Sequence, residues 1–147
     1  MSLVIGPLDQ ADRPRWAELW REYLQFYGAT MPDTVYDHAW ARIQAGTALH
    51  GLAARQDGRI VGITHFLFHE STWTLTPVCY LQDLFVDAQA RGQGAARALI
   101  EAVGAEARKR HATRMYWLTQ DHNETARRLY DRVAKHSGFI RYEYPLG

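Results

Sequence analysis

The sequence YLQDLFV, DAQA, RGQGAARAL runs without a break from residue 80 to residue 99 and holds the most information about the fold. It predicts a strand, then a loop with two glycines, then a helix that begins at the loop. The first N–H groups of a helix have no partner inside it and lie at the positive end of its dipole. Glycines let a phosphate group come close to such a backbone, and Arg91 and Arg97 add positive charge. This stretch therefore predicts an anion-binding site.

The chain before this stretch predicts two helices and a hairpin. Apolar residues from Trp16 to Tyr27 recur at helical spacing, and Gly28 ends that helix. Two strand-like runs flank Asp57-Gly58, which is a strong signal for a two-residue hairpin turn. The elements expected up to the glycine loop are a small strand over 3–7, helices over 16–27 and 35–44, and strands over 49–56, 59–68 and 78–86.

Beyond the glycine loop the pattern alternates between helix and strand. The expected elements are a helix over 94–111, a strand over 114–119, a helix that carries 126–133, and a last strand over 139–146. This order predicts the α/β (α+β) class, with helices on the faces of a mixed sheet. With 147 residues, no repeat and no linker, the chain is expected to form a single domain over residues 1–147.

Composition argues against several classes of partner. A net charge of +1 provides no basic field for nucleic acid, and no apolar run approaches the roughly 20 residues of a membrane helix. The single cysteine, Cys79, cannot form an internal disulfide, and the histidines show no paired metal-ligand spacing. We therefore expect a cytoplasmic protein with no nucleic-acid partner, no membrane span and no metal.

Three phosphate-binding signatures compete for the glycine loop. The dinucleotide fingerprint needs a third glycine where Arg97 stands, and the Walker loop needs a Gly-Lys-Ser or Gly-Lys-Thr that the chain lacks. The R-x-x-G-x-A signature is matched by Arg91, Gly94 and Ala96. In this motif the chain resembles the GCN5-related N-acetyltransferase (GNAT) superfamily. The alternative interpretation is a helix start that binds no ligand.

The resemblance extends over most of the chain and is strongest over residues 80–130. A second motif of the family, N-x-x-A-x-x-L-Y, is matched by Asn123, Ala126, Leu129 and Tyr130. Segments within this region look closest to the branch that contains histone and polyamine acetyltransferases. The resemblance implies a GNAT fold, with a mixed, mostly antiparallel sheet that splays at the cofactor site. It also implies direct transfer, in a ternary complex, of the acetyl group of acetyl-CoA to the primary amine of a polyamine-like small molecule or a lysine.

The resemblance implies roles for individual residues as well. The pantetheine arm would bond backbone groups of Leu84, Phe85 and Val86, and N–H groups near the last two would stabilise the oxyanion. The pyrophosphate would be held by the glycine loop and the first helical turn, namely Arg91, Gly92, Gln93, Gly94, Ala95, Ala96 and Arg97. Asn123 would contact the cofactor, cap its helix, or do both. Tyr130 would protonate the leaving thiolate, and packing in the core is the alternative role for this residue.

The general base is less well defined. An alkyl ammonium must lose a proton before it attacks a thioester. Related polyamine acetyltransferases carry a glutamate where this chain has Gln82, and an amide cannot take a proton. Asp83 is adjacent, but strand alternation predicts that it lies on the opposite face from Gln82. The alternatives are Asp83 itself or a water relay through His65 or Glu70. An acyl intermediate on Cys79 is a weaker option.

The acceptor is expected between the first two helices and the sheet. Aromatic side chains there suit an alkylammonium through cation–π attraction, although aromatic residues on such helices usually pack in the core. The candidate acceptor contacts are Tyr23, Tyr27, Tyr36, Trp117 and Gln82. The short C-terminal strand suggests a homodimer in which a partner subunit completes the sheet. A regulatory module that binds acyl-CoA without turnover is the alternative function, because Gln82 replaces the glutamate.

Overall fold

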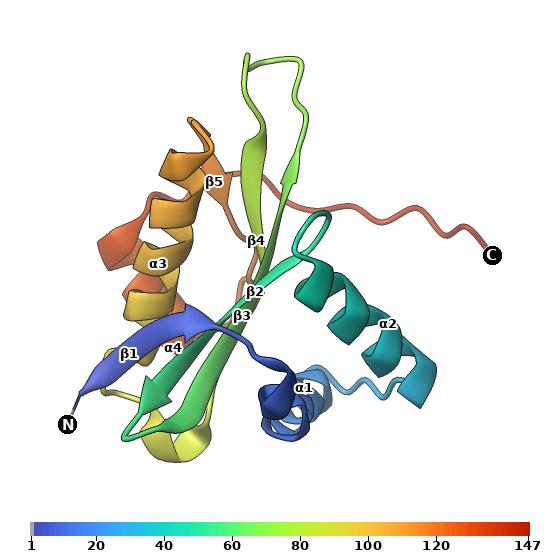
Figure 1. Ribbon diagram of the computed structural model, residues 1–147. Coiled ribbons are helices and arrows are strands. Elements are labelled where there is room, and N and C mark those ends of the chain that lie inside the picture. The colour runs from blue at the N-terminus through green and yellow to red at the C-terminus, as the bar shows by residue number, and fades with distance from the viewer. Residues whose placement is uncertain (1) are drawn as a thin grey trace.

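The computed structural model describes residues 2–147 and has one mixed sheet with strands in the order β1-β2-β3-β4-β5 (Figure 1). The strands are β1 (Leu3–Pro7), β2 (His50–Gln56), β3 (Arg59–His69), β4 (Val78–Val86) and β5 (Met115–Tyr116). The first four pair in antiparallel fashion, and β5 joins β4 in parallel. The predicted hairpin between β2 and β3 turns at Asp57-Gly58, where both residues have positive φ.

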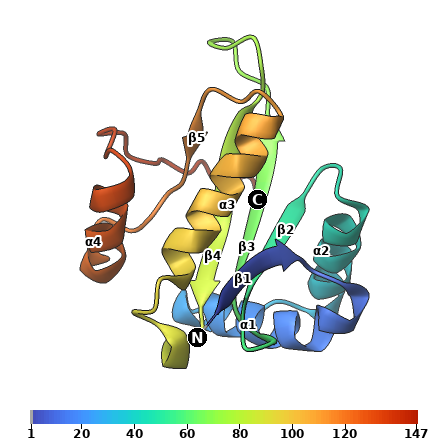
Figure 2. The same ribbon diagram turned by 60° about the vertical axis from the view of Figure 1, so that its left-hand side comes forward.

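Helices cover both faces of this sheet, as expected for the predicted class (Figure 2). They are α1 (Arg13–Phe26), α2 (Asp33–Ala45), α3 (Ala95–Lys109) and α4 (Glu124–Val133), with short 3₁₀ turns at Gln10–Asp12 and Ala88–Ala90. The buried stripe of α1, which includes Trp16 and Leu19, packs with α2 on one face. Leu99 and Val103 of α3 pack on the other face. The α/β prediction is confirmed, and every predicted helix is present.

A β-bulge in β4 changes which side chains face α1. His65 of β3 pairs with Asp83, whereas the next residue, Phe66, pairs with Leu81, so that Gln82 is an extra residue in β4. Leu81 packs in the cluster beneath α3, yet Asp83 bonds His65. In a regular strand these two residues, two positions apart, would share a face. Side chains therefore do not alternate regularly between Leu81 and Asp83. The expectation that placed Asp83 opposite Gln82 assumed regular alternation, and this assumption is wrong.

The predicted last strand over 139–146 is absent. Residues 134–147 form neither helix nor strand and extend away from α4 (Figure 1). The large apolar side chains of this segment are between 76% and 95% exposed, namely Phe139, Ile140, Tyr142, Tyr144 and Leu146. The predicted strand over 114–119 is also reduced to Met115–Tyr116, and it offers very little edge for a further strand. Alternating apolar residues form a strand only where a neighbour accepts their backbone hydrogen bonds.

A buried histidine makes the stability of the fold depend on pH. His50 stacks on Phe66 at 5.2 Å, and its Nε2 has no hydrogen-bond partner within residues 2–147. Burial, assisted by the charge of Arg110, lowers the pKa of His50 below its usual value. The unfolded chain therefore takes up this proton first as the pH falls. The contribution to stability is complete above the unfolded pKa of about 6.5 and is lost as the pH decreases below it.

We accordingly expect the free energy of unfolding to fall between pH 6.5 and pH 5, with a contribution from His50 of at most about 1.4 kcal/mol per pH unit. Urea denaturation of the protein and of His50→Leu across this range measures the effect. The difference in stability between the two proteins should shift in favour of the variant as the pH falls. A difference that stays constant with pH would contradict this prediction.

Candidate active site

The sheet splays between β4 and β5. The two strands pair only at Cys79 with Met115 and at Tyr80 with Tyr116. After Tyr116 the chain leaves β4 and runs to α4 (Figure 2). The backbone of residues 81–86 consequently has no strand partner on this side among residues 2–147. Leu84, Phe85 and Val86 lie in this unpaired half of β4, where free backbone groups can bond an extended polar ligand.

The loop after β4 has the backbone of an anion site. Gly92 and Gly94 have φ of +80° and +88°, and Gly94 is the N-cap of α3. A Cβ built on either glycine meets nothing within 4 Å, so the space in front of both is open. The N–H groups of Ala95, Ala96 and Arg97 belong to the first turn, where a helix leaves its donors free. The loop thus presents free donors at the positive end of the helix dipole.

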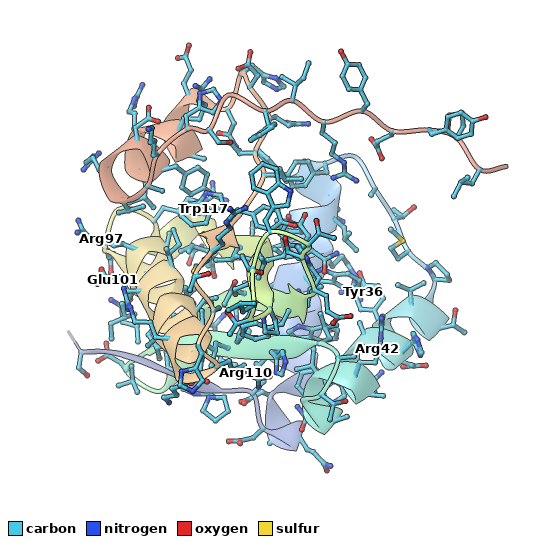
Figure 3. All side chains as sticks on the ribbon, turned by 90° about the horizontal axis from the view of Figure 1, so that it is seen from above. Tyr36, Arg42, Arg97, Glu101, Arg110 and Trp117 are labelled. Carbon is cyan, nitrogen blue, oxygen red and sulfur yellow. The ribbon has the colours of Figure 1, made fainter. Side chains whose placement is uncertain are left out.

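The predicted polar side chains of the loop make different contacts. Arg91 donates from Nε to the carbonyl of Val86 at 3.1 Å and stacks over the ring of Phe85. Arg97 pairs with Glu101 at 3.0 Å on the outer surface of α3 (Figure 3). Gln93 accepts a bond from Gln56 of β2 at 2.7 Å. Arg91 therefore binds the end of β4, whereas the other two side chains bind residues outside the splay.

An arginine that the sequence analysis missed holds the same loop. Arg15 of α1 donates to Asp87 at 2.7 Å and to the carbonyl of Ile60 at 3.0 Å. Asp87 also accepts a bond from the N–H of Gln89, so it fixes the start of the loop. The hydrogen bond from Arg15 is the main cause that lowers the pKa of Asp87. These partners are 72 residues apart, and no local motif signals the pair.

Strain at Gly94 gives a test of the anion site. An alanine at φ of +88° costs about 1–2 kcal/mol, and we expect the loop to relieve this strain by moving its N–H groups. We expect Gly94→Ala to raise the Kd for acetyl-CoA about tenfold in isothermal titration calorimetry. Gly138→Ala is a matched control, because Gly138 has φ of +85° in the C-terminal segment and an added Cβ meets nothing there. Equal Kd values for both variants would remove Gly94 from the site.

The Asp83 carboxylate lies at the boundary between the core and the α1 face of the site. Its side chain is 20% exposed, and its Oδ2 lies 2.9 Å from Nδ1 of His65. Burial and the negative charge of Asp83 together raise the pKa of Tyr23, which places that tyrosine beside the carboxylate. The Tyr23 ring in turn contacts Tyr27 at 5.1 Å and Phe85 at 6.1 Å between ring centroids.

The two other candidates for proton removal are placed less favourably. His65 is only 3% exposed, and its Nε2 accepts a bond from Trp16 at 2.8 Å, so that both ring nitrogens are engaged. Glu70 is five residues beyond His65 along the chain, which is about 16 Å on an extended strand. Asp83 is therefore the carboxylate that the fold places beside Tyr23, which in turn contacts Tyr27.

Residues of α4 and its preceding segment complete the splayed end. Tyr130 packs on Trp117 with ring centroids 5.4 Å apart, and Trp117 lies on the α4 side of the sheet (Figure 3). Burial and the neighbouring Tyr27 raise the pKa of Tyr130, so its hydroxyl carries its proton at neutral pH. Asn123 caps α4 by accepting the N–H of Ala126 at 3.3 Å. Its predicted cofactor contact stays a prediction.

Three predicted residues lie outside this arrangement or differ in environment. Tyr36 is 8% exposed and packs edge-on against Trp20 in the core beneath α2 (Figure 3). Gln82 is exposed at the bulge. Cys79 is buried beneath α3, where burial raises the pKa of its thiol to about 11. Such a thiol is a poor nucleophile at neutral pH.

Comparison with known proteins identifies the family. Residues 14–134 match the sequence profile described as "Acetyltransferase (GNAT) family". The chain belongs to this family. It is 33% identical over 144 residues to the D-amino-acid N-acetyltransferase of Saccharomyces cerevisiae, with 96% of this chain and 89% of that protein covered. It is also 33% identical over 86 residues to the thialysine N-epsilon-acetyltransferase of Caenorhabditis elegans, covering 58% of this chain and 53% of the relative.

A solved structure agrees with the family assignment. The ribosomal-protein-alanine N-acetyltransferase of Brucella melitensis biovar Abortus 2308 superposes with a TM-score of 0.83 and 25% identity, over 99% of this chain and 100% of that one. The chain is therefore a GNAT N-acetyltransferase. Its assignment to the histone and polyamine branch is not confirmed.

GNAT enzymes use acetyl-CoA as acyl donor, and two parts of the chain have free backbone groups of the kind that such a donor could bond. The glycine loop and the first turn of α3 offer free N–H groups in open space for the pyrophosphate. The unpaired half of β4 offers backbone groups for the pantetheine arm. Within residues 2–147, no cluster of His, Cys, Asp and Glu has the composition of a metal site. None of the helices in that range has the length and apolar character to cross a membrane.

Proposed function

We propose that this acetyltransferase transfers the acetyl group of acetyl-CoA to the primary amine of a small molecule of the amino-acid or polyamine type. The observation that carries the proposal is the partly exposed Asp83 carboxylate beside Tyr23, on the strand whose next residues line the splay. A carboxylate beside a tyrosine ring suits an alkylammonium group. The relatives from yeast and the nematode are named for amines of D-amino acids and thialysine, which agrees with this class.

Each step of the acetyl transfer is assigned to a different group of the site. Bound acetyl-CoA supplies the acetyl group. Asp83 takes the proton of the ammonium group, so that the nitrogen gains a free electron pair. Backbone N–H groups near Phe85 and Val86 stabilise the negative charge that develops on the carbonyl oxygen. Tyr130, which carries its proton at neutral pH, protonates the leaving thiolate. The nitrogen releases its second proton to solvent as the amide forms, and Tyr130 regains its own proton from solvent.

Direct transfer from thioester to amine is the route that we propose. The alternative route through an acyl group on Cys79 needs a thiolate, and burial raises the pKa of this thiol to about 11. The thiol also packs beneath α3, in the cluster of Leu81 and Val103. Cys79 therefore lies in the core, where burial outweighs the charge of Arg110 and keeps the thiol protonated.

A regulatory module that binds acyl-CoA without turnover is the second candidate. The exposed Gln82, in place of a glutamate, favours it. The bulge weakens that argument, because it brings the neighbouring Asp83 to the α1 face. The carboxylate of Asp83 is therefore next to Gln82, whose amide cannot take a proton.

Thiol release from acetyl-CoA, measured across a panel of acceptors, tests the function. The panel holds D- and L-amino acids, thialysine, polyamines, arylalkylamines, aminoglycosides and a lysine peptide. We expect a small primary amine to raise the rate at least tenfold above hydrolysis. A rate that rises only with the lysine peptide would replace the small-molecule acceptor with a protein. Tight binding of acetyl-CoA without transfer to any acceptor would support the regulatory module.

We further propose that the protein forms a homodimer through its C-terminal segment. Five large apolar side chains of residues 139–146 are exposed, and four of them, from Ile140 to Leu146, alternate as in a strand. A second copy of the chain supplies both an apolar surface and a strand edge. Light scattering after size-exclusion chromatography should give twice the mass of the chain, and the double variant Ile140→Asp/Tyr142→Asp should give the single mass. A monomer at micromolar concentration would overturn this proposal.

The cytoplasmic location of the protein stays a prediction.

A further inference from the structure

Three side chains form a buried chain of hydrogen bonds that ends at the Asp83 carboxylate. Nε1 of Trp16 lies 2.8 Å from Nε2 of His65, and Nδ1 of His65 lies 2.9 Å from Oδ2 of Asp83. An indole N–H can only donate a hydrogen bond. Nε2 of His65 must therefore be the acceptor and carry no proton. The ring proton is then on Nδ1, where it is donated to Asp83.

The start of this chain has little freedom to move. Trp16 has no exposed surface, and its indole packs against Trp40 at 4.9 Å and Trp20 at 5.6 Å between ring centroids. His65 is in the centre of β3, between pairing partners in β2 and β4. Both donors are thus held by the core, and only the carboxylate at the end of the chain reaches solvent.

We propose that His65 is the positioning residue of the general base and that Trp16 selects its tautomer. This inference rests on the proposed function, in which Asp83 takes the proton of the amine. The bond from His65 to Oδ2 sets the orientation of the carboxylate, which also neighbours Tyr23 on the α1 side. His65 itself does not relay protons, because its two ring nitrogens are committed to Trp16 and Asp83.

The tautomer is directly measurable by ¹⁵N NMR of the histidine ring in the intact protein at pH 7.5. We expect His65 to be a single Nδ1–H tautomer. Trp16→Phe removes the indole donor and should shift the Nε2 resonance of His65. Trp20→Phe is the matched control, because Trp20 stacks on Trp16 but its Nε1 has no acceptor within residues 2–147. An Nε2–H tautomer in the unaltered protein, or equal shifts in the two variants, would overturn the assignment.

Two substitutions of His65 separate positioning from packing. His65→Asn keeps an N–H donor near the position of Nδ1, whereas His65→Leu keeps the volume and removes the donor. We expect His65→Leu to lower kcat roughly 10- to 100-fold, since one charge-assisted hydrogen bond is lost. We expect His65→Asn to recover most of kcat, and both variants to keep the KM for acetyl-CoA.

We expect His65→Leu to be the more stable variant and His65→Asn the more active one, because a buried amide is less favourable than a leucine. A kcat that follows stability, with His65→Leu at least as active as His65→Asn, would show a merely structural role. The proposed function fails separately. If Asp83→Asn retains full kcat, the base is wrong whatever the tautomer of His65. If Asp83→Asn loses kcat and His65→Leu does not, only the positioning role is wrong.

Discussion

Asp83→Asn is expected to lower kcat/KM for the acceptor amine about 100- to 10,000-fold at pH 7.5, with the Kd for acetyl-CoA unchanged. The amide has the shape of the carboxylate, and its oxygen still accepts the N–H of His65. What it loses is the capacity to take a proton. Steady-state rates with the best acceptor and calorimetric titration with acetyl-CoA measure the two quantities.

The pH profile gives this prediction its sharpest test. An amine with a pKa of about 10.4 gains free base roughly tenfold per pH unit below that value. The deficit of Asp83→Asn should therefore shrink as the pH rises from 7.5 to 9.5. Asp37→Asn is the matched control, because Asp37 is exposed on α2 and pairs with Arg13, away from the site. A deficit that does not change with pH would indicate that Asp83 acts in some way other than as a base.

Tyr130→Phe is expected to lower kcat about 100-fold and to change the Kd for acetyl-CoA less than threefold. Phenylalanine keeps the packing on Trp117 and removes only the hydroxyl. Burial raises the pKa of this hydroxyl, so the wild-type residue remains a proton donor throughout the neutral range. Single-turnover measurement of thiol release reports on this step.

Tyr116→Phe is the matched control for Tyr130→Phe. Tyr116→Phe also removes one tyrosine hydroxyl, which here bonds His69, and it should keep kcat. Equal kcat for the wild type and Tyr130→Phe would remove Tyr130 from the mechanism. If neither protein transfers acetyl groups while both bind acetyl-CoA, the chain is the regulatory module.

Most of the fold and the backbone conformation of the glycine loop were predictable. The periodicity from Trp16 to Tyr27 and the Asp57-Gly58 turn gave elements that the structure confirms within a few residues. The two glycines before α3 were predicted to open an anion site, and both have positive φ in front of open space. These predictions rest on local properties, because helical period and glycine conformation depend on near neighbours in the chain.

The acceptor side was less predictable, for a reason that lies in the pairing of strands. Simple alternation misplaced Asp83, because the bulge at Gln82 depends on the register between β3 and β4. Tyr36 had the same amphipathic spacing as a groove residue but packs in the core. The segment over 139–146 has the apolar pattern of a strand, but it pairs with no strand among residues 2–147.

The sequence by itself determined the class of fold, the conformation of the glycine loop and the family, since each of these depends on residues that are close together in the chain. The tertiary structure alone decided which carboxylate lies beside the aromatic residues of α1 and what holds it. His65 and Asp83 are 18 residues apart, and Arg15 and Asp87 are 72 apart. Contacts at such separations form only when strand register and helix packing bring them together, and no local pattern encodes that geometry.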